Sequence, residues 1–258
     1  MVGGAPLPWR VFLVMWTASF QLAHERAGCA RSSRHDAPLE RRPQQRHDIR
    51  HILDRVTRLL LTRHGHVDGI TPKRFRGRAE LALTDLGVRQ AKALAARVAK
   101  DWKPATVYTS AMGRCVATGA AIRDACGVAS SVLEGLTDID YGSWQMRIQD
   151  EIKVEEPELF HLWHAAPHLM RFPGGESLQD LLARTSDALR IVLARHPGET
   201  VVMVGHDSVN RALLLQLLDR PLSAYWTLAQ DPCCLNEIEI VGSKVEVLRI
   251  NDTARLLL

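Results

Sequence analysis

The sequence predicts an α/β protein, a three-layer sandwich in which helices cover both faces of a mostly parallel sheet. From about residue 58 onward, short apolar runs alternate with amphipathic segments of roughly 10 to 20 residues, the pattern of consecutive βαβ units. With 46 % hydrophobic and 24 % charged residues among 258, the composition is that of a globular chain long enough to bury a core.

The strands are expected where apolar runs end in turns. Residues 58–62 lead into Arg63-His64-Gly65, and residues 200–204 are the clearest apolar run in the chain. The other expected strands span 105–108, 130–133, 237–241 and 244–250, the last two flanking a turn at Gly242-Ser243 as a hairpin.

The helices are expected where apolar residues recur near a period of 3.6. Thr84 begins the first of them, and Trp102-Lys103-Pro104 ends it. The others are expected over 113–126, over 148–163 with a break at Pro157, over 176–194 and over 208–218, with Glu176-Ser177 as a helix start.

Residues 1–55 are interpreted as an unfolded N-terminal extension and residues 56–258 as one domain. All of the net charge of +4 falls in residues 1–57, which hold nine Arg against five acidic residues. The apolar part of residues 10–30 is shorter than the ~20 residues that span a bilayer, so stable membrane insertion is not expected. As a signal-like segment it would indicate export, whereas the five sparse cysteines favour the cytoplasm.

Polar side chains follow four of the predicted strands, at the carboxyl ends where ligands bind in such sheets. Arg63-His64-Gly65 follows the first strand, and the segment from Ser110 to Arg114 follows the second. The loop 136–142 follows the third, and Gly205-His206-Asp207 follows the fourth. Two arginines, two histidines and several carboxylates are therefore expected at one edge of the sheet.

These residue types suit a phosphomonoester substrate. Arg63 and Arg114 offer planar, permanently charged groups that match phosphoryl oxygens, and Arg114 lies in the first turn of a predicted helix. A neutral imidazole can attack phosphorus, a second can stabilise the charge that develops, and a carboxylic acid can protonate the leaving alkoxide. The charge balance of the domain argues against nucleic acid as a partner.

Five sequence blocks in order resemble the histidine phosphatase superfamily, which has the phosphoglycerate mutase-like fold. They are Arg63-His64-Gly65, Ser110 to Arg114, Leu136 to Trp144, Gly174 to Ser177 and Gly205-His206, within a resemblance over about residues 58–250. The resemblance implies that His64 is the nucleophile, that Arg63, Arg114 and His206 bind the phosphoryl group, and that Asp138 is the acid. It further implies a small phosphorylated substrate and neither cofactor nor metal.

Three positions depart from the family pattern. Most relatives have Glu where Asp138 stands, many have Glu at the position of His66, and many have Gly at the position of Asp207. In the acid-phosphatase branch the residue after the second histidine is the proton donor, so Asp207 competes with Asp138 for that role. Asp207 is also interpreted as the N-cap of the helix that follows.

Two other enzyme classes remain open. A mutase would return the phosphoryl group to its substrate, although the compact segment 138–174 favours water as the acceptor. A metal-dependent hydrolase would use His64 and His66 with Asp68, but a barrel of that kind needs about 250 residues. The sequence leaves the substrate and the oligomeric state open.

Overall fold

The computed structural model describes residues 55–254, so the expectations for the extension and its signal-like segment 10–30 lie outside the described residues. Six strands form one sheet in the order β3-β2-β4-β1-β5-β6. They are β1 (Thr57–Arg63), β2 (Thr106–Thr109), β3 (Ala129–Val132), β4 (Thr200–Gly205), β5 (Leu235–Val241) and β6 (Lys244–Asp252). All six lie where the sequence predicts them.

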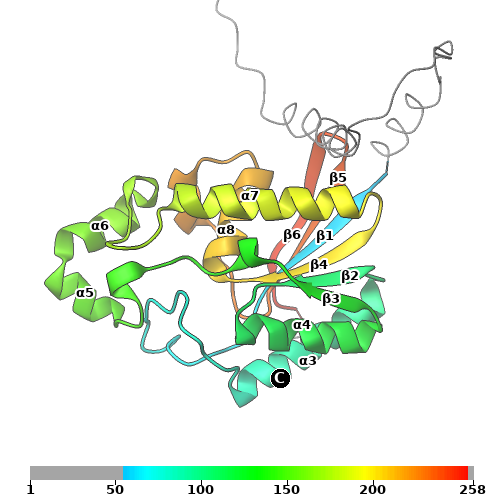
Figure 1. Cartoon of the computed structure of the whole chain (residues 1–258), viewed down its shortest axis with the longest axis horizontal. Coiled ribbons are helices and arrows are strands. Elements are labelled where there is room, and N and C mark those ends of the chain that lie inside the picture. Colours follow the sequence, from blue (N-terminus) through cyan, green and yellow to red (C-terminus); the bar gives the residue numbers. More distant parts are fainter. Residues whose placement is uncertain (1–54, 255–258) are drawn as a thin grey trace, which may run out of the picture.

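Helices cover both faces of this sheet (Figure 1). The pair α3 (Asp85–Asp101) and α4 (Gly113–Cys126) lies on one face, and α7 (Leu178–Arg195) and α8 (Asp207–Leu217) lie on the other. Two short helices, α5 (Gln149–Glu155) and α6 (Pro157–Ala165), lie at one end, separated at the expected proline. None of the helices within residues 55–254 has the length and apolar character needed to cross a membrane.

The sheet is parallel over four strands and antiparallel at one side. β1 and β2 both pair with β4 in parallel, and β3 joins β2 in parallel. The C-terminal hairpin of β5 and β6 adds to the other side of β1 in antiparallel orientation. The predicted α/β sandwich with a mostly parallel sheet is therefore confirmed.

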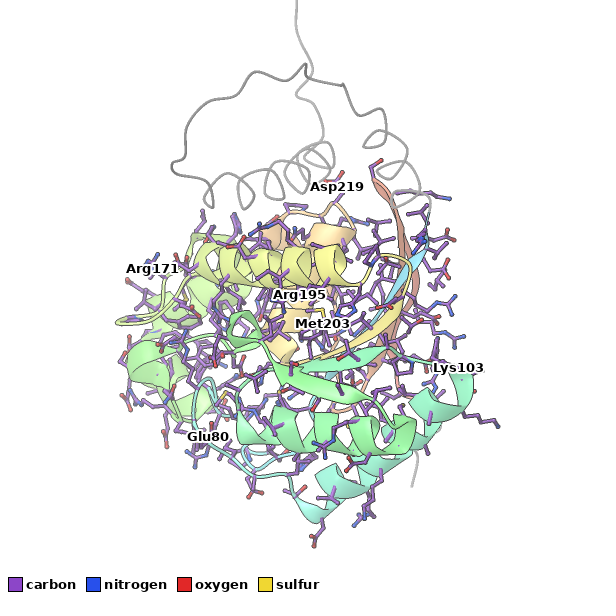
Figure 2. The ribbon with its side chains drawn as sticks, turned by 45° about the vertical axis from the view of Figure 1, so that its right-hand side comes forward. Glu80, Lys103, Arg171, Arg195, Met203 and Asp219 are labelled. Atoms are coloured by element: carbon purple, nitrogen blue, oxygen red, sulfur yellow. The ribbon has the colours of Figure 1, made fainter. Side chains whose placement is uncertain are left out.

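Alternate residues of the central strands enter two different hydrophobic cores. Leu59 and Leu61 of β1 pack in the larger core beneath α7 and α8, whereas Leu60 packs with α3 and α4 on the opposite face. Figure 2 shows Met203 of β4 in the interior of the molecule and the exposed Lys103 and Asp219 at its periphery. Burial on both faces explains why these strands read as uninterrupted apolar runs.

Side-chain caps begin two of the long helices. Thr84 accepts a hydrogen bond from the amide of Gly87 at the start of α3, as expected. Ser177 and Asp180 form a reciprocal capping box at the start of α7. The helix therefore begins at Leu178, two residues later than predicted, and Glu176 lies outside it.

The loop after β1 packs backbone to backbone against the first turn of α3. A Cβ atom on Gly87 would lie 2.1 Å from the carbonyl oxygen of His66, and one on Gly65 would lie 2.5 Å from that of Gly87. The amide of Gly65 also donates to the hydroxyl of Thr118 on α4. Two glycines thus allow the segment that contains His64 to lie directly on the helix layer.

We expect Gly87→Ala to destabilise the protein by about 1–3 kcal/mol, the usual range for overpacking, because the new methyl group meets a backbone atom that cannot rotate away. In a helix without such a contact, alanine is more favourable than glycine by about 1 kcal/mol. A loss of stability in Gly87→Ala would therefore be due to the contact with the His66 carbonyl. Chemical denaturation followed by circular dichroism measures the change.

Gly113→Ala is the matched control, since it also lies in the first turn of a helix. Its Cβ would meet only the end of the flexible Glu80 side chain, at 3.3 Å. An unchanged denaturation midpoint in Gly87→Ala would show that the close approach of loop and helix does not contribute to the stability of the folded protein.

Candidate active site

Strand register brings three predicted site residues together. Arg63 pairs with Gly205 across β1 and β4, and Thr109 pairs with Val204 across β2 and β4. The residues that follow these positions are His64, His206 and Ser110, and they leave the sheet side by side at its carboxyl edge. The amide of His64 donates to the carbonyl of Gly205 at 3.1 Å, which continues the ladder by one residue.

His64 is buried, with 2 % of its surface exposed. Its Nδ1 lies 2.7 Å from the carbonyl oxygen of Gly65, so Nδ1 carries the proton and donates it there. Burial, followed by the repulsion that a protonated His206 would exert and by the charges of Arg63 and Arg114, holds the pKa of His64 well below its usual value. The imidazole is therefore neutral, and its Nε2 keeps a free electron pair.

His206 faces His64 edge to face, with 5.2 Å between the ring centroids. Its Nε2 lies 2.9 Å from the hydroxyl oxygen of Ser110 and 3.4 Å from the thiol of Cys115. Burial and the nearby guanidinium groups of Arg114 and Arg63 lower its pKa well below the usual value. The two histidines thus form a neutral pair within a positively charged surrounding.

Arg63 and Arg114 supply that charge, and each is held by backbone carbonyls. Arg63 donates through Nη1 to the carbonyl of Gln230 at 2.6 Å, and Arg114 donates to the carbonyls of Ala79 and Gly77 at 2.7 Å each. Within residues 55–254 the Nε–H of each arginine is buried without a hydrogen-bond partner. Both side chains are thus held in place while a strong donor on each remains available for an anion.

Asp138 lies against the same arginine and histidine. Its Oδ2 is 3.2 Å from Nη2 of Arg114 and 3.5 Å from Nδ1 of His206. Its Oδ1 accepts hydrogen bonds from the amide of Ile139 and the hydroxyl of Ser208. Asp138 is a buried residue, 8 % exposed, so its loop brings a carboxyl group into contact with Arg114 and His206.

The structure contradicts one of the two interpretations of Asp207, its role as the N-cap of α8. His206 is the N-cap of α8 and makes no side-chain cap, whereas Asp207 is the first helical residue, so the N-cap interpretation was wrong by one position. The carboxylate of Asp207 accepts a hydrogen bond from Nε of Arg211 at 2.6 Å, one helical turn along. It is therefore paired along its own helix.

Two residues that the sequence analysis did not single out complete the site, Ser208 through its side chain and Gln230 through its backbone carbonyl. Ser208 binds Asp138, as described above, and Gln230 binds Arg63 through its carbonyl. Gln230 is in turn held by hydrogen bonds with the side chain of Asn236 and by one from Asn210. Only contacts between distant segments reveal these roles, since neither residue lies in a recognisable pattern.

The residues of the metal-dependent alternative do not converge. Nδ1 of His66 lies 2.9 Å from the hydroxyl oxygen of Thr84, and its amide donates to Gln90. Within the part of the chain that the structure describes, no three His, Cys, Asp or Glu side chains come together as metal ligands. His64 and His66 thus serve different neighbours, one at the sheet edge and one at the start of α3.

Comparison with known proteins agrees with this geometry. Residues 59–253 match the family model of the histidine phosphatase superfamily, branch 1. Phosphoserine phosphatase 1 of Hydrogenobacter thermophilus is 29 % identical over 78 % of this chain and 95 % of its own length. The metal-independent phosphoserine phosphatase of Arabidopsis thaliana is 33 % identical over 63 % of this chain and 69 % of its own.

Solved structures show the same architecture. YhfR of Bacillus stearothermophilus superposes with a TM-score of 0.73 at 30 % identity, covering 78 % of this chain and 99 % of its own. A mycobacterial glucosyl-3-phosphoglycerate phosphatase superposes with a TM-score of 0.70 at 25 % identity, covering 76 % and 99 %. The chain therefore belongs to the histidine phosphatase superfamily, branch 1, and is a phosphomonoester hydrolase.

Proposed function

We propose that the protein hydrolyses small phosphomonoesters by transferring the phosphoryl group to Nε2 of His64 and then to water. One observation carries the proposal: a buried, neutral His64 faces His206 near two arginines that, within the described residues, each keep a buried Nε–H without a hydrogen-bond partner. A neutral imidazole is a nucleophile, and fixed positive groups around it favour a phosphoryl dianion in this place.

In the first step, Nε2 of His64 forms a bond to phosphorus while the bond from phosphorus to the ester oxygen breaks. Asp138, in its protonated form, donates a proton to the departing alkoxide. Arg63, Arg114 and His206 hold the equatorial phosphoryl oxygens, over which the charge spreads in the transition state. The substrate leaves as a free alcohol, and the enzyme keeps a phosphohistidine.

In the second step, water takes the place of the alcohol. The Asp138 carboxylate, now deprotonated, accepts a proton from the attacking water, the bond from nitrogen to phosphorus breaks, and inorganic phosphate forms. Water is the proposed acceptor because the segment after Asp138 is compact, with α5 and α6 as its only α-helices before α7. Phosphoserine phosphatases among the relatives make O-phosphoserine the first alkyl ester to test.

A reducing compartment, the cytoplasm, is part of the proposal. The four cysteines within the described part of the chain are free thiols, adjacent Cys233 and Cys234 included. Burial raises the pKa of each of this pair to about 12, so neither forms the thiolate needed for disulfide exchange near neutral pH.

The unfolding free energy should fall as the pH is lowered from 7 towards 5. Both buried histidines have pKa values well below 6.5 in the folded protein, so below pH 6.5 the unfolded chain takes up protons that the folded chain does not. Above about pH 7 the histidines are neutral in the folded and the unfolded chain alike, so their contribution to the unfolding free energy no longer changes with pH. Denaturant titrations across this range measure the slope.

The variant His64→Asn with His206→Gln, which lacks both imidazoles, is the control for this pH dependence. Its unfolding free energy should change less steeply with pH than that of the original protein. Equal slopes for both proteins would show that the two imidazoles are not held neutral by the site.

His64→Ala should abolish turnover and phosphoryl labelling, because no other nucleophile stands at the centre of the site. Incubation with a ³²P-labelled aryl phosphate in the presence of EDTA should label the original protein with an adduct that is acid-labile and base-stable. Rapid quench followed by gel electrophoresis measures the label.

His66→Ala is the matched control, since it removes the neighbouring imidazole that the metal-dependent alternative requires. It should keep both labelling and turnover. Activity that EDTA abolishes and a divalent cation restores, or a His64→Ala protein that retains half its turnover, would overturn the proposal.

Asp138→Asn should depress single-turnover rates with O-phosphoserine by about 10²–10⁴-fold, the range of general acid catalysis, and depress those with p-nitrophenyl phosphate far less. A nitrophenolate leaves without a proton, so its release does not depend on the acid. Rapid-quench measurement of phosphoenzyme formation with both esters gives the two rates.

Asp207→Asn provides the comparison for this experiment, because its carboxylate pairs with Arg211 on its own helix. It should slow both esters by a similar, smaller factor. The opposite result, leaving-group dependence in Asp207→Asn and none in Asp138→Asn, would assign the proton donor to Asp207.

A further inference from the structure

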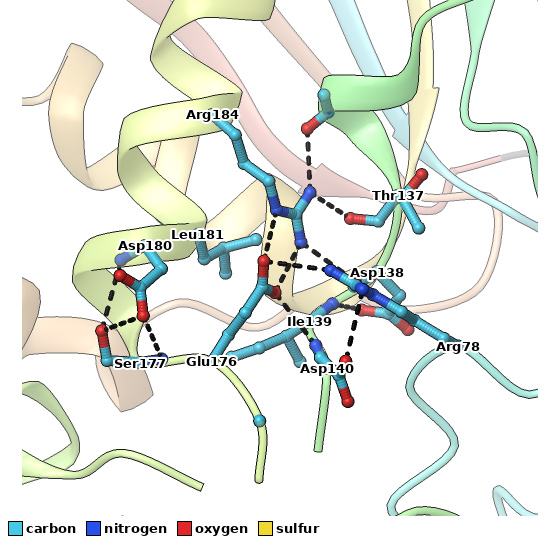
Figure 3. Close-up of polar contacts among 12 residues, drawn as sticks. Arg78, Thr137, Asp138, Ile139, Asp140, Glu176, Ser177, Asp180, Leu181 and Arg184 are labelled. Carbon is cyan, nitrogen blue, oxygen red and sulfur yellow. Dashed lines mark hydrogen bonds and ion pairs between the residues drawn. The ribbon is translucent and has the colours of Figure 1, made fainter. Parts of the chain in front are cut away.

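The backbone of the loop that contains Asp138 is held by a cluster of charged residues (Figure 3). The cluster consists of Arg184 in α7, Glu176 just before that helix, Arg78, and Asp140 in the loop itself. None of these side chains has a role in the proposed reaction. Figure 3 shows Arg184 extending from α7 towards the loop and towards Glu176.

Arg184 uses its whole hydrogen-bonding capacity in this cluster. Nε and Nη2 bind the two carboxylate oxygens of Glu176 at 2.9 Å each. Nη1 donates to the carbonyls of Gly135 and Thr137, and Nη2 also donates to the carbonyl of Asp138 at 3.0 Å. These five contacts match the five N–H groups of a guanidinium. Three of them end on the backbone of one short loop.

Glu176 binds the same loop two residues further on. Its Oε2 accepts a hydrogen bond from the amide of Asp140 at 3.0 Å, and its own amide donates to the carbonyl of Asp140 at 3.0 Å. Burial raises the pKa of Glu176, but hydrogen bonds from Arg184 and the Asp140 amide more than offset this, so the pKa is lowered. The carboxylate is therefore charged and holds both Arg184 and the loop.

Asp138 is thus held both at its backbone carbonyl and at its side-chain carboxylate. Its carbonyl oxygen accepts hydrogen bonds from Arg184 and, at 3.4 Å, from Nε of Arg78, while its carboxylate faces Arg114 and His206. The short side chain of an aspartate has one methylene group between Cα and the carboxylate, so the position of the carboxylate depends closely on where the loop backbone lies.

We propose that Arg184, with Glu176, positions the Asp138 loop so that its carboxylate reaches the leaving group of the substrate. This inference rests on the proposed function, because it assigns Arg184 an effect only through the acid. A misplacement of about 1 Å at a reacting group can reduce the rate by about 10²-fold, so the loss of these hydrogen bonds should be measurable.

The test compares phosphoenzyme formation from O-phosphoserine and from p-nitrophenyl phosphate in single turnovers. Arg184→Met should slow the alkyl ester by about 10- to 100-fold and the aryl ester by at most about twofold. The ratio of the two rates does not depend on the fraction of folded protein, since unfolded protein reduces both equally. In an Asp138→Asn background, Arg184→Met should cause no further loss with O-phosphoserine.

Two further variants separate positioning from charge and stability. Arg184→Lys keeps a positive charge beside Glu176 and near His206, but a single ammonium cannot reach three carbonyls, so the ratio should still fall. If Arg184→Met does not fold, the ratio of the two rates in Arg184→Lys tests the inference instead. Arg190→Met removes an arginine of the same helix that pairs with Asp187, and the ratio should stay unchanged.

Equal slowing of both esters in Arg184→Met or Arg184→Lys, or additive losses in the double variant, would overturn the inference about Arg184. That result is distinguishable from failure of the proposed function. The function fails if the original protein gives no histidine-bound label, a measurement that does not involve Arg184.

Discussion

The parallel pairing of β1 with β4 is the constraint on which the active site depends. Arg63 lies opposite Gly205, and a histidine follows each of these two residues in the chain. The pairing therefore places the two imidazoles next to each other where the strands end. Leu60 and Val202, also opposite each other, are buried on the α3 and α4 face, so the hydrophobic core fixes the same register that the chemistry requires. The site is thus a consequence of how the sheet is packed.

Charge imposes the second constraint. Two buried arginines would be costly without compensation, and the compensation comes from backbone carbonyls together with the single carboxylate of Asp138. Burial, followed by the positive charges of Arg63 and Arg114, lowers the pKa of His64 and of His206 and keeps both imidazoles neutral. The same arrangement that would attract a phosphoryl dianion therefore keeps His64, the proposed nucleophile, in its neutral form.

The strands, the long helices and the residues at the strand ends could be predicted from the sequence, because each depends on a local pattern or on the end of an apolar run. The position of Asp207 relative to the helix cap could not, since a one-residue difference at a helix start leaves the pattern unchanged. The contact of Arg184 with the Asp138 loop was also beyond prediction. It depends on the packing of α7 against a loop some 45 residues earlier, and nothing in the periodicity of α7 distinguishes Arg184 from Arg190.

The contact between Asp138 and Arg114 has a consequence for how tightly the site retains its product. A phosphate ion that approaches Nη2 of Arg114 meets a carboxylate already bound to that group at 3.2 Å. The ion must displace this resident anion or share its donor, and like charges at such a distance repel each other. This contact therefore weakens anion binding at Arg114 only while the Asp138 carboxyl is deprotonated, and the proton that the proposed second step delivers to Asp138 removes the repulsion at the stage when phosphate is the bound product.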